Sequence, residues 1–145
     1  MPSMSVPRPR DPRRRPPATL SVGRTGEASV VIAAGELDLS VTAQLSALLA
    51  GELRRQPPAL VCDTSAVQFC AARILTILID ATADAAVAQV PFAVAGRPRA
   101  LVRPITALGL QHVLPVHRSV AEALNWLALS VDPTSLDAGG YPPSA

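Results

Sequence analysis

The sequence contains no lysine and few aromatic residues: all 13 basic residues are arginine, and Phe, Trp and Tyr make up 3% of the chain. Apolar residues make up 49% of the 145 residues, which is enough for one domain with a packed core. That core must be aliphatic, because aromatic side chains are so scarce. We attribute the absence of lysine to the codon usage of a GC-rich genome rather than to chemistry.

Long apolar runs and ligand clusters are also absent. No run approaches the roughly 20 residues that a membrane-spanning helix needs. Charges and prolines occupy the N-terminus where a signal peptide would have an apolar segment. The two cysteines and two histidines form no cluster at metal-ligand spacing, and the glycines form no phosphate-binding loop. We therefore expect a cytoplasmic binding module without membrane contact, metal or cofactor, and not an enzyme.

Charge and proline divide the chain into three parts. Residues 1–17 hold six prolines, five arginines and no periodic pattern, so we expect a disordered tail. Residues 18–129 form the predicted domain; they balance eight arginines against eight acids, which argues against direct DNA binding. Residues 130–145 contain Pro, Gly, Ser and Asp without a pattern and form a second predicted tail.

Short β-branched apolar segments alternate with segments of helical periodicity. This alternation predicts an α/β fold, with a mixed, mostly parallel sheet of about five strands and about four helices. The expected strands are 18–24, 28–34, 59–62, 91–95 and 112–116. The expected helices are about 41–55, 72–88, 98–108 and 120–128.

Several residues predict where these elements begin and end. Gly35 is expected to end the second strand, and Asp38 or Ser40 to cap the first helix. Residues 64–69 are expected to form a loop between the third strand and the second helix. Pro104 is expected to kink or split the third helix, because it removes an amide donor and crowds the preceding turn.

The strand, loop and helix between residues 61 and 80 are the expected functional centre, because α/β proteins bind ligands where helices start at the end of a sheet. Ala71 and Ala72 have no side chain that could cap the helix, and Arg73 is unfavourable beside the positive end of the helix dipole. Two explanations remain open. Solvent satisfies this helix end, or a carboxylate from a partner or a bound anion completes it.

Three stretches resemble the STAS domain of bacterial anti-sigma factor antagonists. Gly-Glu-Leu-Asp at 35–38 matches the family's motif before its first helix. Asp-Thr-Ser-Ala-Val-Gln-Phe at 63–69 is similar to the family's Asp-Leu-Ser-x-Val-x-Phe, and 96–110 resembles the family's third helix with its final Gly-Leu. The resemblance extends over residues 18–128 and implies a STAS fold.

The resemblance breaks at the phosphorylation motif. In phosphorylation-controlled members, Phe-x-Asp-Ser-Ser-Gly-Leu opens the second helix, and a kinase that is also the anti-sigma factor phosphorylates the first serine. Residues 69–75 here are Phe-Cys-Ala-Ala-Arg-Ile-Leu. Ala72 replaces the acceptor serine and has no hydroxyl, so phosphorylation at this position is chemically impossible. Thr76, one helical turn further on, is a candidate substitute acceptor.

The resemblance implies an anti-sigma factor antagonist that binds an anti-sigma factor, kinase-type or kinase-inactive, and so releases a sigma factor for stress-response transcription. Without the serine, three alternatives stay open: such a protein is a permanently active antagonist, it uses another switch, or it no longer regulates a sigma factor. The alternative is a STAS accessory subunit of a transporter or stress-signalling assembly. We expect a monomer or weak dimer. The expected partner-binding residues are Asp38, Phe69, Cys70, Ala71, Ala72, Arg73 and Thr76.

Two cysteines are candidates for a redox switch. Cys70 lies near a helix N-terminus with Arg73 close by, which is expected to lower the pKa of its thiol. Cys62 lies in an expected buried strand. In a cytoplasmic protein, two reduced and packed cysteines are the ordinary case, and both interpretations stay open here.

Overall fold

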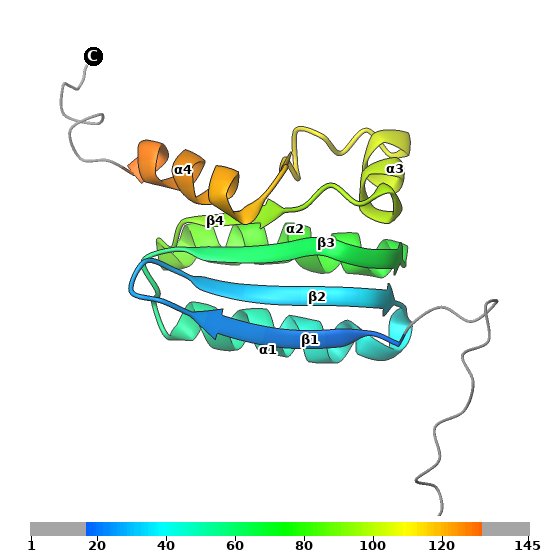
Figure 1. Cartoon of the computed structure of the whole chain (residues 1–145), viewed down its shortest axis with the longest axis horizontal. Coiled ribbons are helices and arrows are strands. Elements are labelled where there is room, and N and C mark those ends of the chain that lie inside the picture. The colour runs from blue at the N-terminus through cyan, green and yellow to red at the C-terminus, as the bar shows by residue number, and fades with distance from the viewer. Residues whose placement is uncertain (1–16, 132–145) are drawn as a thin grey trace, which may run out of the picture.

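The structure, a computed structural model, describes residues 17–131, without the side chains of 129–131. Within these residues, five strands form one sheet in the order β1-β2-β3-β4-β5, with four α-helices (Figure 1). The predicted fold class is confirmed. The predicted tails lie almost wholly outside the described residues. The strands are β1 (Thr19–Arg24), β2 (Ser29–Leu37), β3 (Leu60–Cys70), β4 (Phe92–Ala95) and β5 (Val116–His117). The helices are a 3-10 helix (Leu39–Val41), α1 (Thr42–Arg54), α2 (Ala72–Ala88), α3 (Arg99–Ala107) and α4 (Val120–Val131).

The sheet is antiparallel at one edge and parallel elsewhere. β1 and β2 form a hairpin, closed by a bond from the Thr25 amide to the Ala28 carbonyl at 2.9 Å. β2, β3, β4 and β5 run parallel. α1 lies between β2 and β3, α2 lies between β3 and β4, and α3 with the turns after it lies between β4 and β5. The carboxyl ends of β2 and β3 therefore meet at one end of the molecule (Figure 1).

Two predicted boundaries are wrong, and both concern this end of the sheet. Gly35 does not end β2, which continues to Leu37 with Gly35 at φ 81°. Residues 64–69 are not a loop but the second half of β3. The β2–β3 register shifts between Ile32 and Ala34 and again between Gly35 and Glu36, each time with an extra residue on β3. These bulges break the regular alternation of the strand, which is why its sequence does not show a strand pattern.

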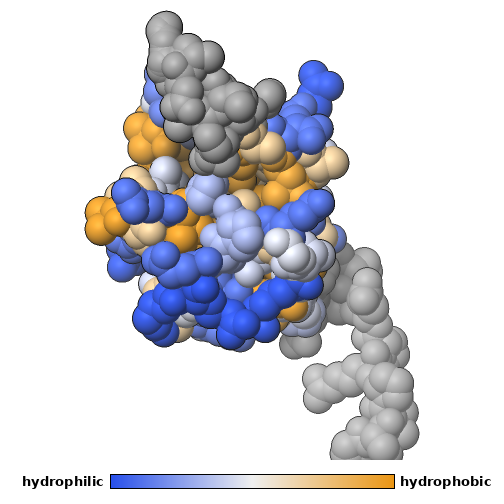
Figure 2. All heavy atoms as spheres, turned by 90° about the vertical axis from the view of Figure 1, so that its left-hand side faces the viewer, coloured by the Kyte–Doolittle hydropathy of each residue, from blue (hydrophilic) through white to orange (hydrophobic). Residues whose placement is uncertain are grey.

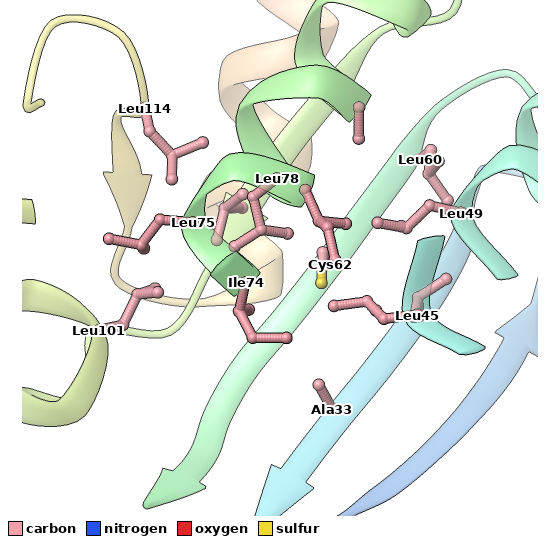
Figure 3. Close-up of a cluster of buried hydrophobic side chains, with 14 of the residues drawn as sticks. Ala33, Leu45, Leu49, Leu60, Cys62, Ile74, Leu75, Leu78, Leu101 and Leu114 are labelled. Carbon is pink, nitrogen blue, oxygen red and sulfur yellow. The ribbon is translucent and has the colours of Figure 1, made fainter. Parts of the chain in front are cut away.

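The main core lies between the sheet and the helices α1 and α2. The apolar faces of both helices point at one face of β2, β3 and β4, with Cys62 among the leucines (Figure 3). A smaller cluster on the opposite face joins Val61 and Ala93 to Ala123 and Leu127 of α4. The front face of β1 and β2 carries no helix in Figure 1. The largest fully buried side chains include Leu37, Leu45, Leu49, Leu60, Ile74, Leu75 and Leu78.

The C-terminal third differs from its prediction in three places. α3 continues unbroken through Pro104, so the expected split is wrong, while a kink at Pro104 stays a prediction. The predicted strand 112–116 is mostly turn, and β5 is only two residues long. α4 reaches Val131 rather than ending near Ala128. Leu114, in the turns before β5, is buried in the main core, so this segment packs against the domain without being a strand.

Candidate functional site

Backbone hydrogen bonds link the carboxyl end of β2 to the carboxyl end of β3. Leu37 pairs with Cys70 in the sheet register, and the Ala71 amide donates a hydrogen bond to the Leu37 carbonyl at 2.9 Å. The segment that follows β2 from Asp38 onward therefore lies beside the start of α2. Both segments hold expected partner-binding residues, and the structure brings their backbones together.

Asp38 is held by its own loop. Its carboxylate caps the 3-10 helix Leu39–Val41 by accepting hydrogen bonds from the Ser40 amide at 2.9 Å and from the Ser40 hydroxyl. These bonds, with the hydroxyl contributing most, lower the pKa of the Asp38 carboxyl. Asp38 is a helix cap, as predicted, but it caps the 3-10 helix rather than α1, whose N-cap residue Val41 makes no side-chain capping bond. The Asp38 carboxyl is an anion at neutral pH.

The first turn of α2 has no side-chain cap. Ala71 is the N-cap residue, its side chain makes no capping bond, and the first turn contains no acid. The Ala71 amide is used by Leu37, and the Ile74 amide donates to the Ala71 carbonyl at 2.9 Å. The amides of Ala72 and Arg73 occupy the positions that have no acceptor within a helix. Both residues are exposed.

A groove of about 270 Å³ runs between α1 and α2 from this helix end. Its floor is apolar, formed by Leu49, Leu53, Ile77 and Ala81. Its rims are polar and carry charges of both signs. The polar rim residues are Thr42 and Ser46 of α1 with Arg73, Asp80 and Asp84 of α2. The start of α2 and the groove thus form one continuous surface.

The remaining predicted site residues divide into packed and exposed ones. Phe69 is half-buried opposite Glu36 in the sheet. Cys70 is also half-buried and packs against the main core. Thr76 is exposed one turn beyond Ala72. Within the described residues, Arg73 makes no ion pair with Asp38 or with any other acid, although both lie at this end.

The expected lowering of the Cys70 pKa is wrong. Burial raises the pKa of Cys70 to about 12, and burial first, then the neighbouring Asp63 and Cys70, raises the pKa of Cys62 to about 12. Both cysteines are free thiols. The error arose because the prediction weighed the helix end and Arg73, whereas the packing of Cys70 against the core decides the outcome. A redox role stays an untested prediction.

Sequence reasoning missed Leu39 and the α1 side of the groove. The Leu39 side chain is 68% exposed next to Asp38, which is unusual for leucine. Thr42, Ser46 and Ala50 recur every four residues and line the groove. This stripe of small residues beside the leucines of α1 was the pattern in the sequence that could have revealed the groove.

Among residues 17–131, no group of three His, Cys, Asp or Glu side chains is placed to hold a metal ion. In the same part of the chain, no helix has the length and apolar character needed to cross a membrane.

The fold, together with the hydrogen-bonded ends of β2 and β3, defines the class of protein. The family model described as "Mlab, STAS domain" matches residues 20–116. The chain belongs to the STAS domain family.

Known relatives bear names that concern transcription control. The chain is 32% identical to the anti-sigma-F factor antagonist RsfB of Mycobacterium tuberculosis over 106 residues, which is 73% of this chain and 86% of RsfB. It is 30% identical to an anti-sigma factor antagonist from Mycobacterium paratuberculosis, with a TM-score of 0.67 over 77% of this chain and 94% of that one. A stressosome chain shares the fold, at 20% identity and a TM-score of 0.59 over 77% of this chain and 99% of that one.

Proposed function

We propose that this protein is an anti-sigma factor antagonist: a non-enzymatic module that binds an anti-sigma factor and so releases a sigma factor. The observation that carries the proposal is its identity of 30–32% to two proteins of that name across 86–94% of their lengths. The exposed surface at the start of α2 supports it, because partner binding needs accessible groups at the end of the sheet.

We further propose that binding does not depend on phosphorylation at residue 72. A phosphate would add close to two negative charges at a helix N-terminus beside the partner. Ala72 is exposed at that position and has only a methyl group. The surface therefore stays in one charge state, which resembles the unphosphorylated form of the phosphorylation-controlled antagonists.

Three features of the surface suit a protein partner. The amides of Ala72 and Arg73 offer donors for a partner carboxylate, and the Arg73 guanidinium adds a charge of the right sign. Leu39 offers an exposed apolar side chain in the segment that follows β2. The groove between α1 and α2 would accept partner side chains along its apolar floor. Most of the binding energy in such interfaces comes from a few anchors of this kind.

The experiment is a titration of the purified chain with each candidate anti-sigma factor of the source organism, followed by calorimetry. Unmodified protein is expected to bind tightly, as checked by intact mass. Ala72→Glu places a negative charge where the family carries phosphate and is expected to weaken binding about tenfold or more. Ala83→Glu, at an exposed position later in α2, is the matched control and is expected to bind normally.

The accessory-subunit alternative has its own outcome. A pull-down from lysate, with and without reductant, identifies the partner directly. An ATPase or permease on the beads, with no anti-sigma factor, would replace the proposal by a transporter or stress-signalling role. A phosphorylated bait would point to Thr76 or another hydroxyl as acceptor. Binding that changes with reductant would revive a cysteine switch.

A further inference from the structure

A long part of the chain carries positive charge without any acid. Residues 85–121 contain no Asp or Glu, although the domain as a whole is neutral. The domain therefore separates its charges along the chain. The arginines of this part are Arg97, Arg99, Arg103 and Arg118.

The sheet register brings two of these arginines to one edge. Ala95 of β4 pairs with His117 of β5, so both strands end side by side. Arg97 follows β4 and Arg118 follows β5 at that edge. The Glu122 carboxylate accepts a hydrogen bond from the Arg118 backbone amide at 2.7 Å, so an acid lies close to Arg118. The other three arginines have no ion-pair partner among residues 17–131.

α3 turns its arginines outward. Arg99 and Arg103 are one turn apart and exposed, while Leu101 and Ile105 of the same helix are buried. Arg97 precedes the helix and is also exposed. Within residues 17–131, none of the three makes an ion pair. We call Arg97, Arg99 and Arg103 the α3 basic surface.

A groove of about 240 Å³ adjoins this surface. Arg97, Thr106 and Gln111 supply its polar lining, and Val102, Leu114 and Val116 supply apolar lining. Leu108 and Val113, 60% and 48% exposed, belong to the same helix end and the turn after it. Unpaired cations and a concave apolar lining therefore occur together.

We propose that the α3 basic surface and its groove dock an acidic protein segment. Carboxylates of the segment pair with the guanidiniums of Arg97, Arg99 and Arg103, and an apolar side chain between the carboxylates enters the groove. Arginine suits carboxylates because its planar fork can bind both oxygens. Charge complementarity favours this occupant, because none of the three arginines makes an ion pair with an acid of residues 17–131.

Two other polyanions fit less well. Nucleic acid would need aromatic platforms or a wider basic field, and the groove is lined by aliphatic and small polar side chains. An anionic membrane is flat and cannot enter a concave groove, and α3 has already buried its apolar face against the core. A peptide segment can follow the groove and present both kinds of side chain.

This surface is separate from the one proposed to bind an anti-sigma factor. It uses α3 and the turn after it, whereas the proposed function uses Asp38, the start of α2 and the α1–α2 groove. Loss of binding at one surface is expected to leave the other intact. The two proposals can therefore fail independently.

The test is fluorescence anisotropy of the full chain with a labelled peptide in which glutamates flank a central leucine. The double variant Arg99→Glu/Arg103→Glu is expected to weaken binding about tenfold, and binding is expected to disappear at about 1 M salt, where the screening length is about 3 Å. The matched control Arg54→Glu/Arg55→Glu reverses two exposed arginines at the C-terminal end of α1 and should bind normally. Figure 2 views the end of the molecule that lies opposite to the carboxyl ends of β2 and β3. Hydrophilic residues gather in the lower part of that view.

The outcomes separate the alternatives. Replacing the central leucine of the peptide by serine is expected to weaken binding several-fold, because the groove loses its apolar occupant. Equal binding by both arginine variants would place the peptide elsewhere, for example on the arginines of residues 1–17, and would overturn the proposal. Tighter binding of a single-stranded oligonucleotide, or of vesicles containing phosphatidylserine, would overturn it too. Unchanged far-UV circular dichroism shows that the variants are folded.

Discussion

The Ala71 amide donates a hydrogen bond of 2.9 Å to the Leu37 carbonyl, which ties the start of α2 to the end of β2. This single bond connects residues that are 34 positions apart in the chain. The next two amides of α2, those of Ala72 and Arg73, have no side-chain cap. The candidate binding surface therefore lies on a backbone arrangement that the core holds in place.

Adding a cap to α2 should stabilise the fold and oppose partner binding. Ala71→Ser is expected to raise the free energy of unfolding by about 0.5–1 kcal/mol, because the hydroxyl accepts a bond from the first turn. The same hydroxyl competes with a partner carboxylate for those amides. Urea denaturation and calorimetric titration measure the two effects. Ala83→Ser, in the interior of α2, is the control and should give no stabilisation. A loss of stability in Ala71→Ser would show that these amides are already satisfied.

Leu39 should contribute to binding but not to stability. Its side chain is 68% exposed, so Leu39→Ala is expected to change the free energy of unfolding by less than about 0.5 kcal/mol. Affinity for the anti-sigma factor should fall about tenfold, since an apolar anchor is lost. Val87, 86% exposed near the other end of α2, provides Val87→Ala as the control. Equal affinity of both variants would remove Leu39 from the interface.

Gly96 should be intolerant of any side chain. Its φ is +87°, and a Cβ would lie 2.4 Å from the Ser65 amide nitrogen, a backbone atom that cannot move aside. Gly96→Ala is expected to lower the free energy of unfolding by about 2–4 kcal/mol. Gly109 has φ +67° but open space around it, so Gly109→Ala isolates the dihedral strain, about 1 kcal/mol. Equal losses in thermal denaturation would rule out crowding at Gly96.

The ion pair of Arg24 with Glu52 should make stability fall in acid. The guanidinium binds both carboxylate oxygens, at 2.7 and 3.1 Å, and this hydrogen bonding lowers the pKa of the nearly buried Glu52 below its ordinary 4.5. A carboxyl whose pKa is lower in the folded state than in the unfolded state stabilises the fold at pH values above its unfolded-state pKa. That stabilisation is lost as the pH falls through its folded-state pKa. Glu52→Gln should therefore be less stable than wild type at about pH 7, with a difference that shrinks below about pH 4.5.

Urea denaturation across this pH range measures that difference. Glu27→Gln, at an exposed position near the hairpin turn, should follow the wild type at every pH. A gap between wild type and Glu52→Gln that stays constant down to about pH 3 would contradict the linkage.

The cysteines should react slowly in the folded protein. A rise of the Cys70 pKa from 9.0 to about 12 lowers the thiolate fraction about a thousandfold. Labelling by iodoacetamide near neutral pH should therefore be far slower in the folded chain than in urea. Cys62→Ser and Cys70→Ser assign the residual rate to one thiol. Fast labelling of Cys70 in the folded chain would favour the redox switch.

The order of the elements and the helix ends could be predicted from local chemistry. Alternating apolar periodicities are properties of neighbouring residues, and they placed α2 at Ala72–Ala88 without error. The cap at Asp38 and the uncapped start of α2 also depend only on side chains within a few positions. The absence of a hydroxyl at Ala72 is likewise a property of the sequence itself.

Only the tertiary structure decided the second half of β3, the pKa of Cys70 and the grooves. Residues 64–69 become a strand because β2 pairs with them through two bulges, and the buried Thr64 hydroxyl bonds to the Ala95 carbonyl at 2.8 Å. The pKa of Cys70 follows from burial against distant side chains, not from its neighbours in the chain. Pairing, burial and concave surfaces arise between segments far apart in sequence, so local patterns could not reveal them.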